Sequence, residues 1–298
     1  MVEIKNIVFT NYKTTFTLGF LRFLNHLLPL RLKFLNESFV ALIDGNNLGV
    51  ITLDKDSKSH SRFKITKLIL EENSSLIAKQ LINYAITRYR EMGANSFYVV
   101  VDEKITDLLE IFKNEMNFRN CGCEYLYKIN SINTSYDLSL KPFRKQNVRE
   151  ICKFYNENIN SFNRFLFSRQ EYQFFNGYYK YIFYNEEKSC ILGYFEVATK
   201  NNIDFYINFT IDCAHNIYLI DAIKFISSKL KQKYKKFNLY IKIKDYVMNS
   251  KDLLAILKEN NAEFISKSQI LAKDYYKEIK QDNILKNAKI IFNDPTTA

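Results

Sequence analysis

The stretch that most limits the fold of this chain is a strand, a helix and a second strand between residues 63 and 102. The first apolar run is FKITKLIL (63–70) and the second is SFYVVVD (96–102), and β-branched and aromatic residues fill both. Between them, apolar residues recur at helical spacing: Ile77, Leu81, Tyr84 and Ala85. Such a crossover normally joins parallel strands of one sheet and leaves unpaired backbone N–H groups at the start of the helix. That start can bind an anion.

The same order of elements recurs in the second half of the chain. A hairpin is expected over residues 38–54 and again over 178–198, and each is followed by a strand, a helix, a strand, a helix and a closing strand. Matching residues keep register: Gly193 follows Gly49 by 144 residues, Tyr240 follows Tyr98 by 142, and Asp252 follows Asp107 by 145. We infer an internal duplication. The N-terminal copy is expected in residues 1–132 and the C-terminal copy in 133–298, with a tail after about residue 280.

The length of the chain allows two domains, and its positive charge is compatible with several anionic partners. The 298 residues are enough for two domains that each bury a core, and the formal charge of +11 could favour nucleic acid, anionic lipid or a phosphorylated ligand. The densest basic run, KLKQKYKKF (229–237), ends a predicted helix, where cations suit the helix dipole and the solvent. No recognisable RNA-binding motif accompanies it, so a nucleic-acid partner is not expected, although the basic charge leaves it open.

The cysteines and the apolar segments set further limits. Five cysteines form neither a disulfide framework nor a zinc pattern, because Cys121-Gly-Cys123 lacks a second pair or histidines at ligand spacing. We therefore expect no metal site and a reducing, cytoplasmic location. Polar residues interrupt the apolar stretch 16–35, so a transmembrane segment is not expected, although an amphipathic helix at a membrane interface stays open.

Four segments carry a resemblance to a known family: LGVITL (48–53), KLIL (67–70), SFYVVVD (96–102) and EMNFR (115–119). With the order of elements, they resemble the GCN5-related N-acetyltransferase (GNAT) family, duplicated in tandem. The resemblance covers nearly the whole chain except the tail. It implies an α/β fold of two tandem GNAT-like domains, each with a mixed, mostly antiparallel sheet flanked by helices.

The resemblance also implies a cofactor site. In the GNAT family the fourth strand splays from the fifth, the gap takes the pantetheine arm of acetyl-CoA, and a loop written Q/R-x-x-G-x-G/A binds the pyrophosphate. Asn73 matches the Gln/Arg place and Ala78 the last small residue, whereas Leu76 departs from the first glycine. Ser74 or Ser75 can equally serve only to cap the helix. The implied cofactor-binding residues are Leu68, Leu70, Asn73, Ser74, Ser75, Leu76, Ile77, Ala78 and Lys79.

The catalytic residues of the family are matched only in part. The family often uses a Glu near the fourth strand as base, and Glu71 and Glu72 are the candidates here, although acids at a helix start also suit the helix dipole. The family's catalytic Tyr lies in the helix after the fifth strand. That place falls at Phe112 or Lys113 in the N-terminal copy and near Glu259 in the C-terminal copy, so neither copy has the tyrosine.

The corresponding loop of the C-terminal copy, residues 213–216, has no glycine. We expect Ile217, Tyr218 and Leu219 to crowd the phosphate position there, and we read His215 either as a functional residue or as part of a polar turn. The cofactor is therefore expected in the N-terminal copy. Leu81 and Leu108 are expected to be core residues and not ligand contacts.

The resemblance implies an acyl-CoA-dependent N-acyltransferase that transfers an acetyl group to a small-molecule or peptide amine. Two alternatives stay open. One is a catalytically inactive binding or scaffold protein with the same fold, and the other is an aminoacyl-tRNA-dependent transferase, whose affinity for RNA would depend steeply on salt. The sequence does not indicate an oligomeric state.

Overall fold

The computed structural model describes residues 3–6, 37–43, 46–55, 61–70, 74–130, 138–175, 179–199 and 201–275. In the N-terminal copy the elements are β1 (Glu3–Asn6), β2 (Glu37–Ile43), β3 (Asn46–Lys55), β4 (Arg62–Leu70), α2 (Ser75–Glu91), β5 (Ser96–Asp102), α3 (Thr106–Glu110), the π-helix η2 (Ile111–Glu115) and β6 (Arg119–Ile129). In the C-terminal copy they are β7 (Lys141–Pro142), η3 (Lys145–Asn147), α4 (Val148–Glu157), η4 (Ser161–Asn163), α5 (Arg164–Phe167), η5 (Glu171–Phe175), β8 (Tyr179–Asn185), β9 (Cys190–Thr199), β10 (Asp204–Ile211), η6 (Cys213–Tyr218), α6 (Leu219–Lys231), β11 (Asn238–Lys244), α7 (Ser250–Glu259) and β12 (Glu263–Asp274).

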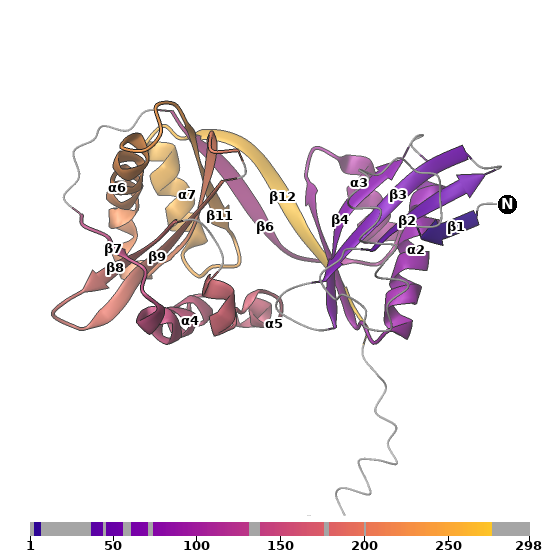
Figure 1. Cartoon of the computed structure of the whole chain (residues 1–298), viewed down its shortest axis with the longest axis horizontal. Helices are drawn as coiled ribbons and strands as arrows, with labels where there is room; N and C mark the ends of the chain where they lie inside the picture. The colour runs from indigo at the N-terminus through magenta and orange to yellow at the C-terminus, as the bar shows by residue number, and fades with distance from the viewer. Residues whose placement is uncertain are drawn as a thin grey trace, which may run out of the picture.

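The described strands form one sheet in the order β1-β2-β3-β4-β5-β12-β6-β11-β10-β9-β8-β7. The closing strands are exchanged, because β12 of the C-terminal copy lies between β5 and β6, and β6 of the N-terminal copy pairs with β11. Figure 1 shows two lobes that β6 and β12 connect as two long, adjacent strands. The mixed, mostly antiparallel architecture is as expected, but the expectation of two separate sheets is wrong. The division near residue 132 remains a prediction about the sequence repeat.

The repeat is visible in the strand ladders. In the hairpin of β2 and β3, Ala41 pairs with Gly49 and Leu42 with Asn47, so Leu48 is the extra residue of a bulge. In the hairpin of β8 and β9, Leu192 is the extra residue in the same way. Leu192 follows Leu48 by 144 residues, which is the spacing that the sequence repeat predicts. Because bulges sit at defined places in a ladder, this match supports a duplicated fold.

Gly49 shows why a glycine stands beside this bulge. It pairs with Leu70 at the end of β4. A Cβ on Gly49 would lie 2.9 Å from the carbonyl oxygen of Ile69 and 3.2 Å from Cδ1 of Leu81 on α2. The missing side chain therefore lets α2 pack closely over β3 and β4.

Three clusters of buried side chains hold the two lobes. The first packs α2 against β3, β4 and β5, and Leu81 is completely buried in it, as predicted. The second packs α6 and α7 against β9, β10 and β11. The third lies on the opposite face of the sheet under α4 and α5, and the partly buried Tyr98 and Val100 of β5 pack against it. Helices of the C-terminal copy therefore help to bury a strand of the N-terminal copy.

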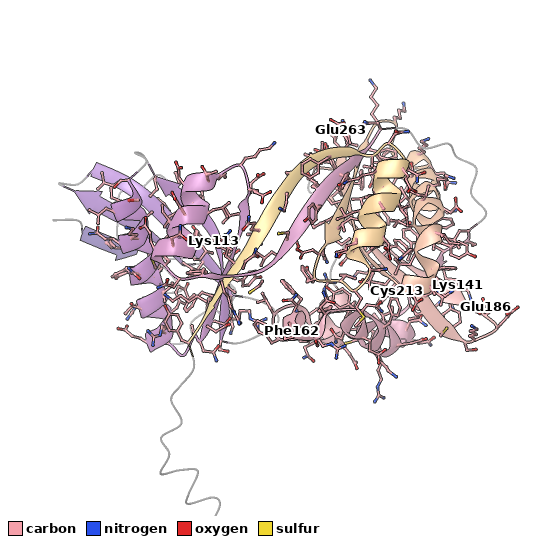
Figure 2. The ribbon with its side chains drawn as sticks, turned by 180° about the vertical axis from the view of Figure 1, so that it is seen from behind. Lys113, Lys141, Phe162, Glu186, Cys213 and Glu263 are labelled. Carbon is pink, nitrogen blue, oxygen red and sulfur yellow. The ribbon has the colours of Figure 1, made fainter. Side chains whose placement is uncertain are left out.

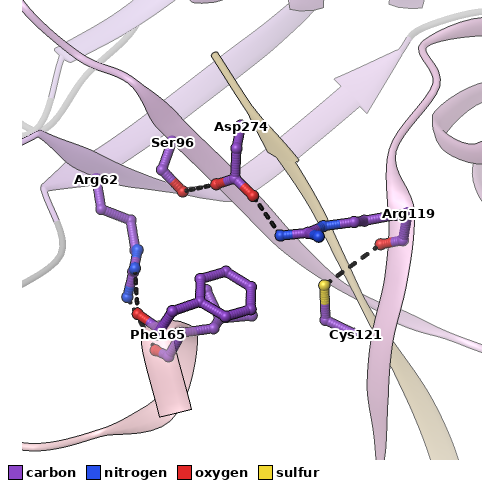
Figure 3. Close-up of polar contacts among 7 residues, drawn as sticks. Arg62, Ser96, Arg119, Cys121, Phe165 and Asp274 are labelled. Atoms are coloured by element: carbon purple, nitrogen blue, oxygen red, sulfur yellow. Dashed lines mark hydrogen bonds and ion pairs between the residues drawn. The ribbon is translucent and has the colours of Figure 1, made fainter. Parts of the chain in front are cut away.

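Polar contacts also join the two lobes (Figure 3). The Arg62 guanidinium donates to the carbonyl oxygens of Leu166, at 2.9 Å, and Phe165, at 2.5 Å. Asp274 on β12 accepts from the Ser96 hydroxyl at 2.6 Å and from Arg119 at 2.5 Å. The start of β4 is thus anchored to α5, and the end of β12 to β5 and β6.

Most predicted elements lie within a few residues of their expected places. In residues 138–143 the structure has only the two-residue strand β7, and the helix α6 is preceded by the 3-10 turn η6. Residues 44–45, inside the expected hairpin of 38–54, and the expected tail after about residue 280 lie outside the described residues. No helix within the described ranges is long and apolar enough to cross a membrane.

Candidate functional site

The first gap is the space between the ends of β4 and β5. These two strands are parallel and pair only from Arg62–Ile65 to Ser96–Val99. At Thr66 the ladder of β3 and β4 is interrupted, because Thr52 pairs with Lys67 while Leu53 pairs with Ile65. This bulge bends β4 where it leaves β5, since an extra residue in one strand adds local twist. Residues 66–70 and 100–102 therefore diverge, as the resemblance implied.

The helix α2 starts beside the end of β4. Ser74 caps it, because its hydroxyl accepts from the N–H of Ile77 at 3.4 Å, and the N–H of Ala78 donates to the Ser74 carbonyl at 3.1 Å. The N–H groups of Ser75 and Leu76 precede that first intrahelical bond, so they point out of the helix end. Together with the positive end of the helix dipole, they can bind an anionic group.

A pocket of about 480 Å³ lies between the end of β4, the start of α2, and α3 with η2. Its apolar side chains can enclose an uncharged chain, whereas the charged side chains among its described lining residues are all carboxylates. The lining residues are Leu68, Leu70, Ser75, Ile105, Asp107, Leu108, Glu110, Ile111 and Glu115.

One ammonium group stands close to this acidic lining. Lys79 on α2 forms an ion pair with Glu115 on η2, and both side chains are about one-third exposed. The pair links the two helices that border the pocket. Lys79 is therefore neutralised by a carboxylate of the protein, which limits what it can offer to a ligand phosphate.

The structure distributes the predicted cofactor residues among three roles. Leu68, Leu70 and Ser75 line the pocket, and Ser74 is the helix cap. Leu76 is 61% exposed, so its side chain points away from the core, while Ile77 and Ala78 are buried in the core beneath α2. For these three residues only the backbone can contribute to an anion site. Glu71, Glu72 and Asn73 lie outside the described residues.

Six of the nine lining residues are ones to which the sequence analysis assigned no ligand role. The prediction that Leu108 is a core residue is wrong: it is half-buried and lines the pocket, while the adjacent Leu109 is buried. The helix turns its Asp107, Leu108 and Ile111 edge toward β4. Residues 107, 108, 111 and 115, at the spacing i, i+1, i+4 and i+8, share one helix face. That signal groups them, but it does not show which neighbouring element the face contacts.

At the other border of the first gap, Glu103 follows β5. Its carboxylate accepts from Lys267 Nζ at 2.9 Å and from Gln269 Nε2 at 3.0 Å, both on β12. The hydrogen bond from Lys267 lowers the pKa of Glu103 and raises the pKa of Lys267, so both groups are charged at neutral pH. The exchanged strand β12 therefore supports the end of β5.

The place of the family's catalytic tyrosine holds no suitable acid in the N-terminal copy. Phe112 is buried in the core, with 1% of its surface exposed. Lys113 is half-buried, and Figure 2 shows it on the N-terminal lobe, away from the labelled Cys213 on the other lobe. In the C-terminal copy Glu259 is exposed at the end of α7.

The second gap lies between residues 209–211 of β10 and 243–244 of β11. It resembles the first gap, but a side-chain hydrogen bond crosses it. Here the parallel pairing ends at Asn208 and Lys242. Asn249 is 4% exposed, and its amide donates to the carbonyl oxygen of Ile211 at 2.9 Å and to Oδ1 of Asn216. A polar bridge therefore ties the end of β10 to the start of α7.

That Ile217–Leu219 crowd the phosphate position of the C-terminal copy stays a prediction. Ile217 is 73% exposed and Tyr218 is 37% exposed, because the turn η6 delays the α-helix and directs them outward. Leu219 is buried under α6. Asp212 caps this turn by accepting from the Ala214 N–H at 2.9 Å, and it also contacts His215 Nδ1 at 2.9 Å. His215 is thus part of the cap.

Metal ligands do not gather in the described part of the chain. Within those residues, no group of three or more His, Cys, Asp or Glu side chains could hold a metal ion. Cys121 and Cys123 are buried and free. Burial, reinforced by the Asp245 carboxylate, raises the pKa of the Cys123 thiol to about 11, so it is protonated at neutral pH.

No protein-family model and no curated protein sequence matches this chain. Solved structures do match it over most of its length. A GCN5-related N-acetyltransferase from Sphaerobacter thermophilus matches with a TM-score of 0.58 at 8% identity, over 81% of this chain and 82% of that one. A tandem GNAT protein from the clavulanic acid biosynthesis pathway matches with a TM-score of 0.56 at 10% identity, over 93% of this chain and all of that one.

A third structure, an acetyltransferase from the GNAT family of Colwellia psychrerythraea, matches with a TM-score of 0.50 at 9% identity, over 92% of this chain and 100% of that one. At such identities the similarity concerns the fold, and fold alone does not fix an activity. The match to a tandem GNAT protein over 93% of this chain agrees with the duplicated order of elements. The chain has the GNAT fold, in its tandem form.

Proposed function

We propose that this protein is an acyl-CoA-dependent N-acyltransferase that transfers an acetyl group to the amine of a small molecule or peptide. The observation that carries the proposal is the first gap, which opens into a pocket of about 480 Å³, whereas Asn249 bridges the second gap. Apolar side chains at the end of β4 and on α3 fit the pantetheine arm of acetyl-CoA. The donor site is therefore proposed in the N-terminal copy.

The residues around the pocket divide the work of binding. The N–H groups of Ser75 and Leu76 would hold an anionic part of the donor at the start of α2. Leu68, Leu70 and Ile105 would exclude water from the thioester arm. A bound acyl thioester supplies an activated acyl group. Glu71 and Glu72, which follow Leu70 in the chain, remain the proposed acceptors of the proton that the amine must lose.

A second candidate function is a binding protein that keeps the GNAT fold without turnover. It is favoured by Phe112, which is buried at the position of the family's tyrosine, and by the pairing of Lys79 with Glu115. Such a protein would bind the donor or a related ligand in the same pocket but would release no thiol.

The test is a calorimetric titration of the purified protein with acetyl-CoA, followed by assay of thiol release with a panel of amines. Micromolar binding with thiol release supports the enzyme, and binding without release supports the second candidate. Ile105→Trp fills the pocket from an exposed position and should weaken binding at least tenfold, whereas Ile217→Trp is the matched control on an exposed residue of the C-terminal copy. No binding up to millimolar acetyl-CoA would contradict the enzyme and leave only a binding protein for a different ligand.

A further inference from the structure

We infer that the pocket of the first gap recognises the pantetheine arm of its donor and gains no affinity from the nucleotide. This inference rests on the proposed function, since it concerns the same donor site. It starts from the charge of the lining. Asp107, Glu110 and Glu115 contribute three carboxylates, and the lining contains no lysine, arginine or histidine among the described residues.

Lys79 does not reverse this charge. It is a turn beyond Ser75 on α2, but its ammonium group is held by Glu115 across the edge of the pocket. Three carboxylates therefore face one ammonium group that already has a partner. A phosphate group of the donor would have to compete with Glu115 for Lys79.

The two parts of coenzyme A differ in charge, the property to which an acidic lining responds. The nucleotide carries several negative phosphate charges, which the carboxylates repel over distances comparable to the Debye length. The pantetheine arm is uncharged, with amide groups and short apolar segments. It matches the apolar members of the lining, of which Leu68, Leu70 and Ile105 come from both sides of the pocket.

The N–H groups of Ser75 and Leu76 supply the opposing attraction, because a helix start favours an anion. Each such contribution is small at an exposed site and is screened by salt. We therefore expect the attraction of the helix start and the repulsion of the carboxylates to offset one another. The nucleotide would then add no net affinity.

The experiment compares acetyl-CoA with S-acetylpantetheine, which lacks the nucleotide, by calorimetry at low salt. The two dissociation constants should agree within about threefold. The double variant Asp107→Asn, Glu110→Gln removes two exposed carboxylates from the lining. It should bind acetyl-CoA about tenfold more tightly than the parent protein does, with no more than a twofold change for S-acetylpantetheine. The gain should shrink in about 0.5 M salt.

The matched control is Asp252→Asn, Glu259→Gln, which makes the same change of net charge on exposed residues of α7. It should leave both dissociation constants unchanged. Acetyl-CoA that binds more than tenfold more tightly than S-acetylpantetheine would overturn the inference and leave the proposed function intact. If neither ligand binds up to millimolar concentration, the donor site itself is wrong and both proposals fall.

Discussion

The two gaps of this molecule have the same origin and different contents. In each, parallel strands pair for only four or five residues and then diverge. The residue at the start of the following helix differs: Ile105 precedes α3 and is 47% exposed, whereas Asn249, 144 residues later, precedes α7 and is buried. Asn249 reaches the last carbonyl of β10, while Ile105 contributes to the wall of a pocket.

The two copies of the duplicated fold therefore share the pairing of their hairpin strands and differ in the residues that border the gaps. The bulges at Leu48 and Leu192 and the glycines beside them are shared, because they shape the hairpins that both copies need. The buried amide of Asn249 hydrogen-bonds the carbonyl oxygen of Ile211 and Oδ1 of Asn216, and so ties the end of β10 to the start of the helix that follows β11. The N-terminal lobe forgoes that bond and retains a pocket.

The largest change in stability is expected when a core residue of the N-terminal copy is truncated, compared with a residue of its pocket wall. Leu81→Ala should lower the free energy of unfolding by about 2–5 kcal/mol, because the side chain is completely buried under α2. Leu108→Ala should cost less than about 1 kcal/mol, since Leu108 is half-buried and partly faces the pocket. Urea denaturation measures both. Equal losses would show that Leu108 belongs to the core after all.

The next effect concerns the bridge of the second gap. Asn249→Ala leaves the buried carbonyl of Ile211 without its side-chain donor and should lower the free energy of unfolding by about 1–3 kcal/mol. The converse change, Ile105→Asn, should leave the fold intact and weaken acetyl-CoA binding about tenfold, because the amide can reach toward the end of β4. If Asn249→Ala is neutral by urea denaturation, the bridge is not what closes the second gap.

A smaller difference is expected between the paired glycines. Gly49→Ala places a Cβ against a backbone oxygen, so it should cost about 1–2 kcal/mol. At Gly193 the nearest atoms are Cε2 of Phe195 at 3.0 Å and Cβ of Phe183 at 3.3 Å, so no contact is as short as the 2.9 Å at Gly49 and the closest atom is a ring carbon. Gly193→Ala should therefore cost about half as much. Thermal unfolding of the two variants tests the ranking, and a greater loss at Gly193 would reverse it.

The smallest effect tests the exchange of closing strands. Glu124 on β6 accepts from Lys242 on β11 at 3.0 Å. Burial raises the pKa of Glu124, but the ammonium groups of Lys242 and Lys244 outweigh it, so the pKa is lowered overall. Because the pKa is lower in the folded state, the ionised Glu124 carboxylate stabilises the folded protein above the ordinary pKa of 4.5. That contribution to stability is lost as the pH falls below 4.5 and through the lowered pKa of the folded protein.

Glu124→Gln should therefore reduce the free energy of unfolding at pH 7, and the difference from the parent protein should disappear as the pH falls below about 4.5. Urea denaturation between pH 3.5 and 7 follows it. A difference that persists unchanged at the lowest pH would mean that the ionised pair does not hold β6 against β11.

The sequence predicted the elements of the fold better than their connections. Local periodicity identified β4, α2 and β5 almost to the residue, because burial on one face sets both the period of 2 and the period of 3.6. The exchange of β6 and β12 could not be predicted, since either closing strand satisfies the same ladder beside β5. Only the competition between the two pairings decides it.

The site residues that lie at the end of a predicted strand or the start of a predicted helix could be identified from the sequence. Those whose position depends on how a helix packs against the sheet could not. Leu68, Leu70 and Ser75 follow from the end of β4 and the start of α2. The roles of Asp107, Glu110 and Glu115 depend on how α3 rotates against β4, which the spacing alone leaves undecided. Likewise, the sequence did not indicate the 3-10 turn η6, in which Ile217 is exposed, or the hydrogen bond from Asn249 to the carbonyl oxygen of Ile211.

The most direct test of this account is a crystal structure of the protein with acetyl-CoA or S-acetylpantetheine. The account predicts ligand density in the N-terminal copy, with the pantetheine arm between β4 and β5 beside Leu68 and Leu70, and an Asn249 bridge that stays closed. Ligand bound between β10 and β11, with Asn249 displaced, would contradict it.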